Sequence, residues 1–407
     1  MEFRNLTPFD ALAWSVEDVD AEESHVVVVR VGYRLARVTS APLPGAPDED
    51  DATPTHHCEL REGRASPRLA FEDGYFGAPL VSSVRGESDL APFKPRCDVL
   101  VNATAFAPRG EEAARWPVRV RVVQPAGAEV LLDKTLSVCG PRWFERAEED
   151  WSLSEPEPAL AVPVRWEHAY GGTSHVPEAE LNEACFTNPV GCGWVEARWF
   201  DAMERAGHEV PSRLPAPQIE DPRRPVKSLD VVRHPDGVED AMQMANAVLR
   251  YAGAPAGLGA VGRAWTPRLQ RAGTYDDAWR QARWPHLPED FDFAYWNAAP
   301  DDQQLEALPP DARFELVNLV SPEHALGGVL RAALPGHRAL VLLRMNDGAL
   351  VPFMMTIDTL IIDAESLAVD VIWRTVFSRE LDIRVAEARF EIDPTAPLVR
   401  LAAPRAG

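Results

Sequence analysis

The chain has 407 residues, 46% of them hydrophobic, so it can bury a sizeable core and is not a disordered tail. Its formal net charge is −22, because 63 acidic residues outnumber 41 basic ones. This balance disfavours binding to nucleic acid or anionic lipid through general electrostatics. The 37 prolines argue against an all-helical fold.

Cysteine usage and hydropathy bear on the compartment. The five cysteines are odd in number and scattered, which is not a disulfide framework and favours a reducing environment. The first residues lack a basic segment followed by an apolar run, so we expect no signal peptide. The sequence contains no run of about 18 apolar residues that would predict a membrane-spanning helix. These features predict a cytoplasmic protein with no membrane partner.

Residues 1–166 are predicted to form an N-terminal β-rich unit. Residues 24–40 contain a long β-branched run, which is typical of a strand buried on both faces. Further strands are predicted at residues 98–106, 118–123, 130–138 and 160–166. Residues 118–123 alternate apolar and basic side chains, so one face should be wet, and we expect them to form a hairpin with residues 130–138.

Residues 167–312 are predicted to form an irregular middle segment in which aromatic residues alternate with Gly and Pro. Such a stretch makes few backbone ladders of its own, so it becomes ordered only if its rings find pockets. Short helices are expected at residues 195–206, 238–251 and 275–284. In the last of these, Asp276 and Asp277 favour the positive end of the helix dipole.

Residues 313–407 are predicted to form a second β-rich unit. Strands are expected at residues 314–319, 339–345, 350–355, 359–362 and 367–377, and the tail after Pro394 is expected to fray. The turn Asn346-Asp347-Gly348 between two apolar runs is a strong hairpin signal. We therefore predict a mainly β (α+β) fold, with two antiparallel β-rich units flanking the middle segment.

An internal duplication is a further hypothesis. Leu100-Val101-Asn102 recurs as Leu316-Val317-Asn318, and Thr135-Leu136 recurs as Thr359-Leu360. Leu160 to Trp166 also resembles Leu367 to Trp373, and all of these matches occur in the same order. The alternative is that strands of similar composition match by chance.

Several motifs suggest chemistry but lack the context that the chemistry needs. Gly257 to Gly262 matches the dinucleotide fingerprint, yet Pro267 would stop any helix within a turn, so a flexible loop is favoured. Candidate metal ligands lack zinc spacing; they are His56, His57, Cys58, Cys185 and Cys192. We therefore predict no cofactor and no metal.

A hydrolase or carbohydrate-active protein is the alternative function. Glu167 and His168 could act as an acid and base pair, and Cys192 stands between two glycines where a substrate could approach. The sequence has no G-x-S-x-G turn, and Glu167 and His168 could equally satisfy the backbone of a loop. If the alternative is correct, the three side chains should converge in one pocket.

A set of motifs resembles the bacterial family catalogued as domain of unknown function 2169, over residues 24 to at least 304. The matching pieces are Arg165 to Gly172, Asn188 to Gly193, Leu214-Pro215 with Ile219 to Pro222, Trp265 to Arg268, Gly273 to Asp276, Trp284-Pro285 with Leu287 to Asp292, and Asn297 to Gln304. Two departures are Cys192, where a basic residue is more typical, and residues 195–208, which look like a local insertion.

The resemblance implies a non-enzymatic adaptor or chaperone of type VI secretion. Such proteins are thought to bind a toxic effector, often with a PAAR-type tip domain, and to help load it onto the spike protein. No catalytic residue is then expected. The predicted protein-binding residues are Tyr170, Trp194, Trp265, Tyr275, Trp284, Phe291 and Trp296. A third hypothesis is a structural component of the apparatus, which predicts stable homo-oligomers.

Overall fold

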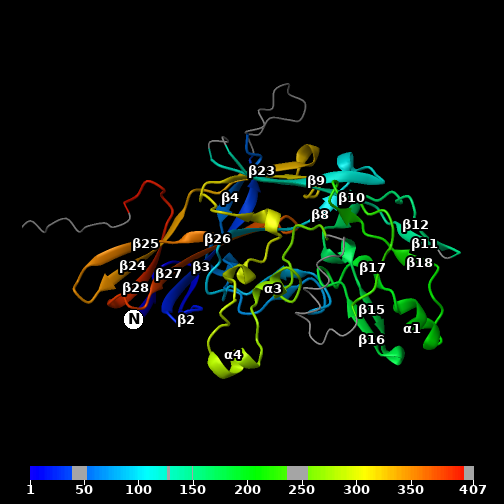
Figure 1. Cartoon of the computed structure of the whole chain (residues 1–407). Coiled ribbons are helices and arrows are strands. Elements are labelled where there is room, and N and C mark those ends of the chain that lie inside the picture. The colour runs from blue at the N-terminus through cyan, green and yellow to red at the C-terminus, as the bar shows by residue number, and fades with distance from the viewer. Residues whose placement is uncertain (39–52, 126–128, 149, 236–254, 398–407) are drawn as a thin grey trace, which may run out of the picture.

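The computed structural model describes residues 1–38, 53–125, 129–148, 150–235 and 255–397. Strands dominate these residues and the helices are short, so the predicted mainly β fold is confirmed (Figure 1). None of the helices in the described ranges has the length and apolar character needed to cross a membrane.

Three sheets make up the body of the molecule. The largest has the order β2 (Asp10–Glu17), β3 (Glu23–Arg37), β27 (Ala368–Ser378), β26 (Thr356–Asp363), β7 (Cys97–Asn102), β21 (Gln304–Leu305), with β4 (His56–Leu60) also on β3. The second has the order β19 (Ile219–Glu220), β10 (Val130–Cys139), β9 (Arg115–Val123), β22 (Arg313–Val317), β23 (Val329–Ala333). The third has the order β1 (Glu2–Asn5), β28 (Ile383–Glu391), β24 (Arg338–Met345), β25 (Leu350–Met354).

Smaller sheets and short helices complete the fold. The small sheets are β12 (Asp150–Leu153), β11 (Trp143–Ala147) and β18 (Arg213–Pro215); β13 (Ala161–Pro163) and β8 (Thr104–Phe106); β14 (Tyr170–Gly171), β17 (Cys192–Glu196) and β20 (Asp230–Val232); β15 (Thr173–Val176) and β16 (Leu181–Ala184); and β5 (Gly74–Tyr75) and β6 (Val84–Gly86). The α-helices are α1 (Trp199–Arg205), α3 (Arg268–Arg271) and α4 (Asp277–Ala282). The 3-10 helices are η1 (Gly63–Ala65), η2 (Pro108–Gly110), η3 (Trp166–His168), η4 (Pro177–Ala179), η5 (Phe293–Trp296), η6 (Asp301–Gln303) and η7 (Leu326–Gly328).

Strand β3 is buried on both faces, as its β-branched run predicts. Val27, Val29 and Val31 pack into the main core, which also includes residues of β9, β22 and β24. Val28 points to the opposite face and packs with Ala260, Ala298 and other apolar residues. Because successive side chains of a strand alternate between faces, the seven-stranded sheet carries one core on each side. Residues of the middle segment cover the second face.

Strands from the two ends of the chain share the main sheets. β3 pairs antiparallel with β27, β7 pairs parallel with β26, and β9 pairs antiparallel with β22. The sheets therefore run across the predicted boundaries at residues 166 and 312. β13 pairs with β8, whereas its proposed counterpart β27 pairs with β3 and β26, so a duplication would require an exchange of strand partners.

Most local predictions agree with the structure, with two differences: one helix begins later than expected, and several strands were not predicted. The hairpins β9–β10 and β24–β25 are confirmed. The helix expected at residues 195–206 begins only at Trp199, because residues 192–196 instead pair as β17 with β14 and β20. Strands β1, β2 and β28 were not predicted. The helix expected at residues 238–251 lies outside the described residues.

Candidate functional site

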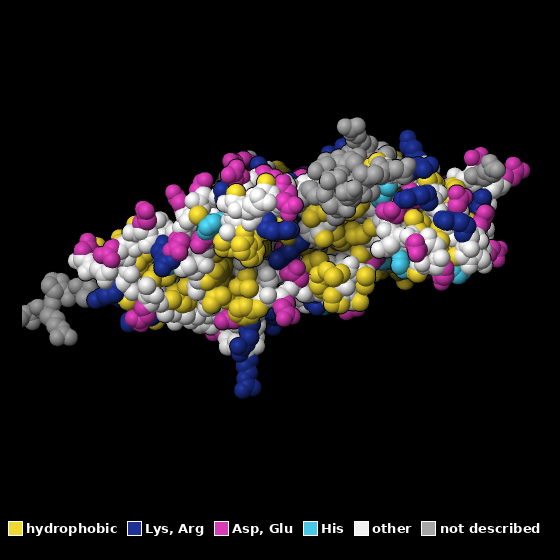
Figure 2. All heavy atoms as spheres, turned by 60° about the horizontal axis from the view of Figure 1, so that its bottom comes forward, with side chains coloured by type: hydrophobic (Ala, Val, Ile, Leu, Met, Phe, Trp, Pro, Cys, Tyr) yellow, Lys and Arg dark blue, Asp and Glu magenta, His cyan; other side chains and the backbone are white. Residues whose placement is uncertain are grey.

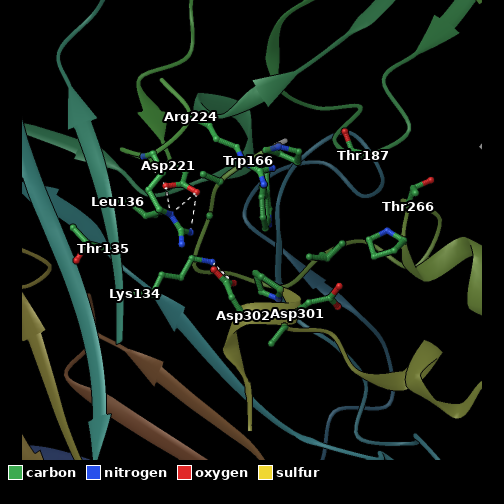
Figure 3. A pocket seen from close by; sticks show the side chains of 18 of the residues that line it. Lys134, Thr135, Leu136, Trp166, Thr187, Asp221, Arg224, Thr266, Asp301 and Asp302 are labelled. Carbon is green, nitrogen blue, oxygen red and sulfur yellow. Dashed lines mark hydrogen bonds and ion pairs between the residues drawn. The ribbon is translucent and has the colours of Figure 1, made fainter. Parts of the chain in front are cut away.

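Segments that are far apart in the sequence line one open cavity of about 1020 Å³ (Figure 3). One wall comes from Asp133 to Leu136 of β10. Five of the family motifs also contribute to the lining, each through a residue within the motif or next to it. These residues include Trp166, Thr187, Asp221, Thr266 and Asp301. Five of the seven motifs that carry the family resemblance therefore meet around one space, and we take this cavity as the candidate functional site.

Trp166 occupies a fixed position in the cavity wall. Its ring packs edge to face against Trp265 at 5.9 Å between ring centroids, and its Nε1 donates to the Ala260 carbonyl at 2.8 Å. A Cβ on Gly257 would lie 2.7 Å from the Trp166 ring, so only glycine allows this approach. The glycine-rich stretch that resembles a dinucleotide fingerprint thus makes room for a tryptophan.

Asn188 joins two motifs through hydrogen bonds next to the cavity. Its side-chain amide donates to the carbonyls of Trp166 at 2.8 Å and Tyr170 at 2.9 Å. Its backbone carbonyl accepts from Gly172 N at 2.9 Å. Gly171 has a φ of +150°, and a Cβ there would lie 2.0 Å from the Asn188 carbonyl oxygen. The two consecutive glycines are required because the two loops are in backbone contact.

Buried charges tie the remaining motifs to the core sheet. Asp98 of β7 accepts from the backbone N–H groups of Ala298 at 2.9 Å and Ala299 at 3.2 Å, and from Lys94 Nζ at 2.8 Å. Arg268 of α3 forms a bidentate ion pair with Glu87 and also donates to carbonyls of the middle segment. These bonds place Pro300 to Asp302 and α3 along the cavity.

Most of the charges that face the cavity are paired within the chain. Lys134 Nζ donates to Asp302 at 2.7 Å and to the Gln303 side chain at 2.9 Å, and Lys134 and Asp302 point toward each other in Figure 3. Arg223 pairs with Asp221 at 2.9 Å, and Arg271 pairs with Asp301 at 3.1 Å. Burial lowers the pKa of Lys134, and the Asp302 carboxylate opposes this shift. The cavity walls therefore combine ion-paired side chains with apolar ones such as Trp166 and Leu136.

Glu220, beside the cavity residue Asp221, is buried between two arginines. It accepts from Arg142 Nη2 at 2.8 Å, from Val226 N at 2.9 Å and from Arg115. Burial alone would raise the pKa of Glu220, but the hydrogen bonds from Arg142 and Val226 outweigh burial and the pKa is lowered. The folded state therefore holds this carboxylate ionised.

Glu220→Gln is expected to lower the free energy of unfolding by about 2 kcal/mol at pH 7, because a charged acceptor facing Arg142 is lost. The pKa is lower in the folded state than in the unfolded state, so this contribution is fully present above pH ~4.5 and disappears as the pH falls through the folded-state pKa. Urea unfolding of both proteins between pH 7 and pH 3 should show the two stabilities converging in acid. The exposed Glu209→Gln is the control.

The structure separates the predicted protein-binding rings into three groups, which are buried, half-buried and exposed. Buried rings belong to Tyr170, Trp194, Trp265 and Phe291. Trp296 is half-buried, whereas Tyr275 and Trp284 are 50% and 68% exposed. Tyr170 donates to Asp230 at 2.6 Å, and Trp194 stacks near His234, so both rings hold the small sheet of β14, β17 and β20 together. A partner could reach the buried rings only if the fold opened, which narrows the candidate contacts to Tyr275 and Trp284.

The residues of the alternative hydrolase hypothesis have separate structural roles. Glu167 accepts from Ser83 N at 2.8 Å and from the Ser83 hydroxyl. Burial lowers the pKa of His168 and raises the pKa of Cys192 to about 12. Glu167, His168 and Cys192 all lie in described ranges, and no hydrogen bond joins any two of their side chains there. Cys192 Sγ lies 4.0 Å from the Ala169 carbonyl oxygen.

Sequence reasoning missed the residues that make the cavity. Lys134 lies in a strand that reads as an ordinary alternating β-strand, and no local pattern shows that it meets Asp302 far along the chain. The one available signal was that the family motifs are rich in Pro, Asp and Arg. Within the described ranges, no group of three or more His, Cys, Asp or Glu side chains is arranged to hold a metal ion.

The fold and the site define a mainly β protein in which strand β10 and several segments between Trp166 and Asp302 line one open cavity. A family model described as "Uncharacterized protein conserved in bacteria (DUF2169)" matches residues 21–374, so the chain belongs to that family. No curated protein and no solved structure matches the chain.

Proposed function

We propose that this protein is a non-enzymatic adaptor of type VI secretion that holds a toxic effector, often one with a PAAR-type tip domain, and helps load it onto the spike protein. The observation that carries the binding role is the convergence of the family motifs on one open cavity. The link to type VI secretion is supported by the resemblance of those motifs to the adaptor family.

The chemistry of the cavity suits a polypeptide better than a reaction. Most of its charges already have partners within the chain, as in the Lys134–Asp302 pair. Proline and tryptophan side chains hold its walls in one conformation, so little entropy is lost when a partner binds.

A thiol whose pKa is about 12 stays protonated at neutral pH, which makes Cys192 a weak nucleophile.

The binding role is tested by charge reversal at the cavity. Arg223 and Arg224 line the cavity and are exposed, so the Arg223→Glu/Arg224→Glu protein should fold normally. We expect it to bind a purified type VI effector with a PAAR-type tip domain at least tenfold more weakly, a loss of about 1.4 kcal/mol measured by calorimetry. The matched control is Arg64→Glu/Arg68→Glu, which reverses two exposed charges outside the cavity lining.

Two results would contradict the adaptor role. One is unimpaired effector delivery from a strain that lacks this gene. The other is equal effector affinity in the cavity variant and its control. A stable homo-oligomer in the purified protein would instead favour a structural component of the apparatus.

Cys192 distinguishes the adaptor from the hydrolase alternative. Because burial raises the pKa of Cys192 to about 12, we expect the native thiol to react with iodoacetamide at pH 7.5 about a thousandfold more slowly than an ordinary thiol. Mass spectrometry measures the extent of labelling. Cys192→Ala should still deliver the effector. Rapid labelling in the native protein, together with lost delivery by Cys192→Ala, would favour a nucleophilic role; urea-unfolded protein gives the reference rate.

A further inference from the structure

Residues 274–290, here called the arm, project from the body of the molecule and carry α4 (Figure 1). The two ends of the arm are joined where it leaves the body, because the Asp290 carboxylate accepts hydrogen bonds from Thr274 N at 2.9 Å and from the Thr274 hydroxyl at 2.7 Å. Helix α4 begins at an N-cap in which Asp276 accepts from Trp279 N at 2.8 Å. The arm is therefore an ordered element that is stabilised by hydrogen bonds within itself.

Contacts with the N-terminal hairpin brace the arm. His286 Nδ1 lies 2.7 Å from the Glu17 carboxylate, and Arg283 donates to the Val19 carbonyl. Trp279 Nε1 donates to the His286 carbonyl at 3.0 Å, which links helix α4 to the segment of the arm that returns to the body. The arm is held in place before any partner arrives, so docking through it would lose little conformational entropy.

The arm places aromatic rings in solvent. Half-buried Trp279 packs edge to face with Tyr275 at 4.7 Å and with Trp284 at 5.7 Å between centroids. Tyr275 and Trp284 remain 50% and 68% exposed. Tryptophan and tyrosine are the residues most enriched among energetically dominant interface contacts. In Figure 2, which brings forward the lower side of Figure 1 where α4 lies, hydrophobic side chains gather in the middle of the face.

Acidic side chains outnumber basic ones on the arm, and two of them, Asp277 and Glu289, pair with Arg280 and Arg283. Asp277 and Glu289 each have 81% of the side chain exposed. Within the arm, the carboxylates of Asp276, Asp277, Glu289 and Asp290 outnumber the guanidinium groups of Arg280 and Arg283. The whole chain carries a formal charge of −22. An apolar centre with an acidic border is complementary to an apolar groove that is edged by Lys and Arg.

We propose that the arm is a preformed docking element that inserts Trp284 and Tyr275 into an apolar groove with basic edges on the effector. This inference rests on the proposed adaptor function and adds a second contact surface, separate from the cavity, with a defined partner chemistry. Burial of the rings supplies affinity, and the acidic border speeds encounter with the basic groove.

The test uses the 407-residue chain and a purified type VI effector with a PAAR-type tip domain, with kinetics measured by biolayer interferometry. Trp284→Ala/Tyr275→Ala should raise the Kd at least tenfold, mainly through faster dissociation. Asp277→Lys/Glu289→Lys should slow association and reduce its dependence on NaCl; both carboxylates are 81% exposed, and their partners Arg280 and Arg283 are 71% and 25% exposed. The control is Ile392→Ala, which removes a 62% exposed apolar side chain outside the arm.

The possible outcomes separate the two proposals. If wild type binds and the ring variant binds as tightly as Ile392→Ala, the arm proposal is wrong and the adaptor role stands. If the ring variant is weak but charge reversal leaves association unchanged, the basic groove is wrong. If wild type does not bind the effector at all, both proposals are overturned. Thermal unfolding of each variant shows whether weak binding reflects misfolding.

Discussion

Asp98→Ala is expected to lower the free energy of unfolding by about 4 kcal/mol. Asp98 is fully buried on β7 and joins the seven-stranded sheet to the middle segment through the N–H groups of Ala298 and Ala299. Its removal leaves those N–H groups without an acceptor and leaves the buried Lys94 ammonium without its carboxylate. Breaking a buried, hydrogen-bonded ion pair from one side typically costs 3–5 kcal/mol.

Chemical denaturation followed by tryptophan fluorescence measures this loss. Asp98→Asn should fall between wild type and Asp98→Ala, because an amide oxygen can still accept from the backbone while the charge facing Lys94 is lost. Asp201→Ala removes an exposed carboxylate from α1 and should change stability by less than about 0.5 kcal/mol. If Asp98→Ala matched this control, the middle segment would not depend on the sheet in the way the hydrogen bonds indicate.

Arg268→Met is expected to destabilise the protein by about 3–5 kcal/mol, since it leaves the Glu87 carboxylate buried without its bidentate partner. It also removes the donors to the Val261 and Tyr295 carbonyls, which hold α3 against η5. Because Arg268 lines the cavity, effector binding should weaken together with stability.

A double-mutant cycle separates the charge from the packing. Arg268→Met/Glu87→Leu removes both charges and should recover at least half of the stability lost in Arg268→Met, because no buried charge is left unpaired. Arg271→Met, which breaks a pair with the exposed Asp301, should cost under about 1 kcal/mol. No recovery in the double variant would mean that the lost carbonyl contacts, and not the orphaned carboxylate, dominate.

Local structure was predictable where neighbours in sequence determine it. The β-branched run of β3 required burial on both faces, and the Asn346-Asp347-Gly348 turn required a hairpin between β24 and β25. The helix that was expected from residue 195 shows the opposite case. Residues 192–196 pair with β14 and β20 on either side, and these pairings override the local helical pattern.

Exposure of the aromatic rings was not predictable in the same way. Trp265 and Trp284 both stand in Trp-Thr-Pro or Trp-Pro contexts with similar local composition. Trp265 is buried because Trp166, about a hundred residues earlier, packs against it, whereas Trp284 lies on the arm, where its ring packs against Trp279 and stays 68% exposed. The burial of a ring depends on which segments, distant in sequence, pack against it. The sequence alone therefore could not divide the predicted protein-binding rings into core residues and contact residues.

The amino-acid sequence by itself determined the acidic charge, the strand-rich fold class, the individual hairpins and the motifs of the family, because each depends on composition or on residues close together in the chain. Only the tertiary structure decided that the motifs surround one cavity, that Lys134 meets Asp302 there, and that Tyr275 and Trp284 stay in solvent. These features require contacts between residues that are distant in sequence, such as β3 with β27 and Asp98 with Ala298, and no local pattern encodes which partner is chosen.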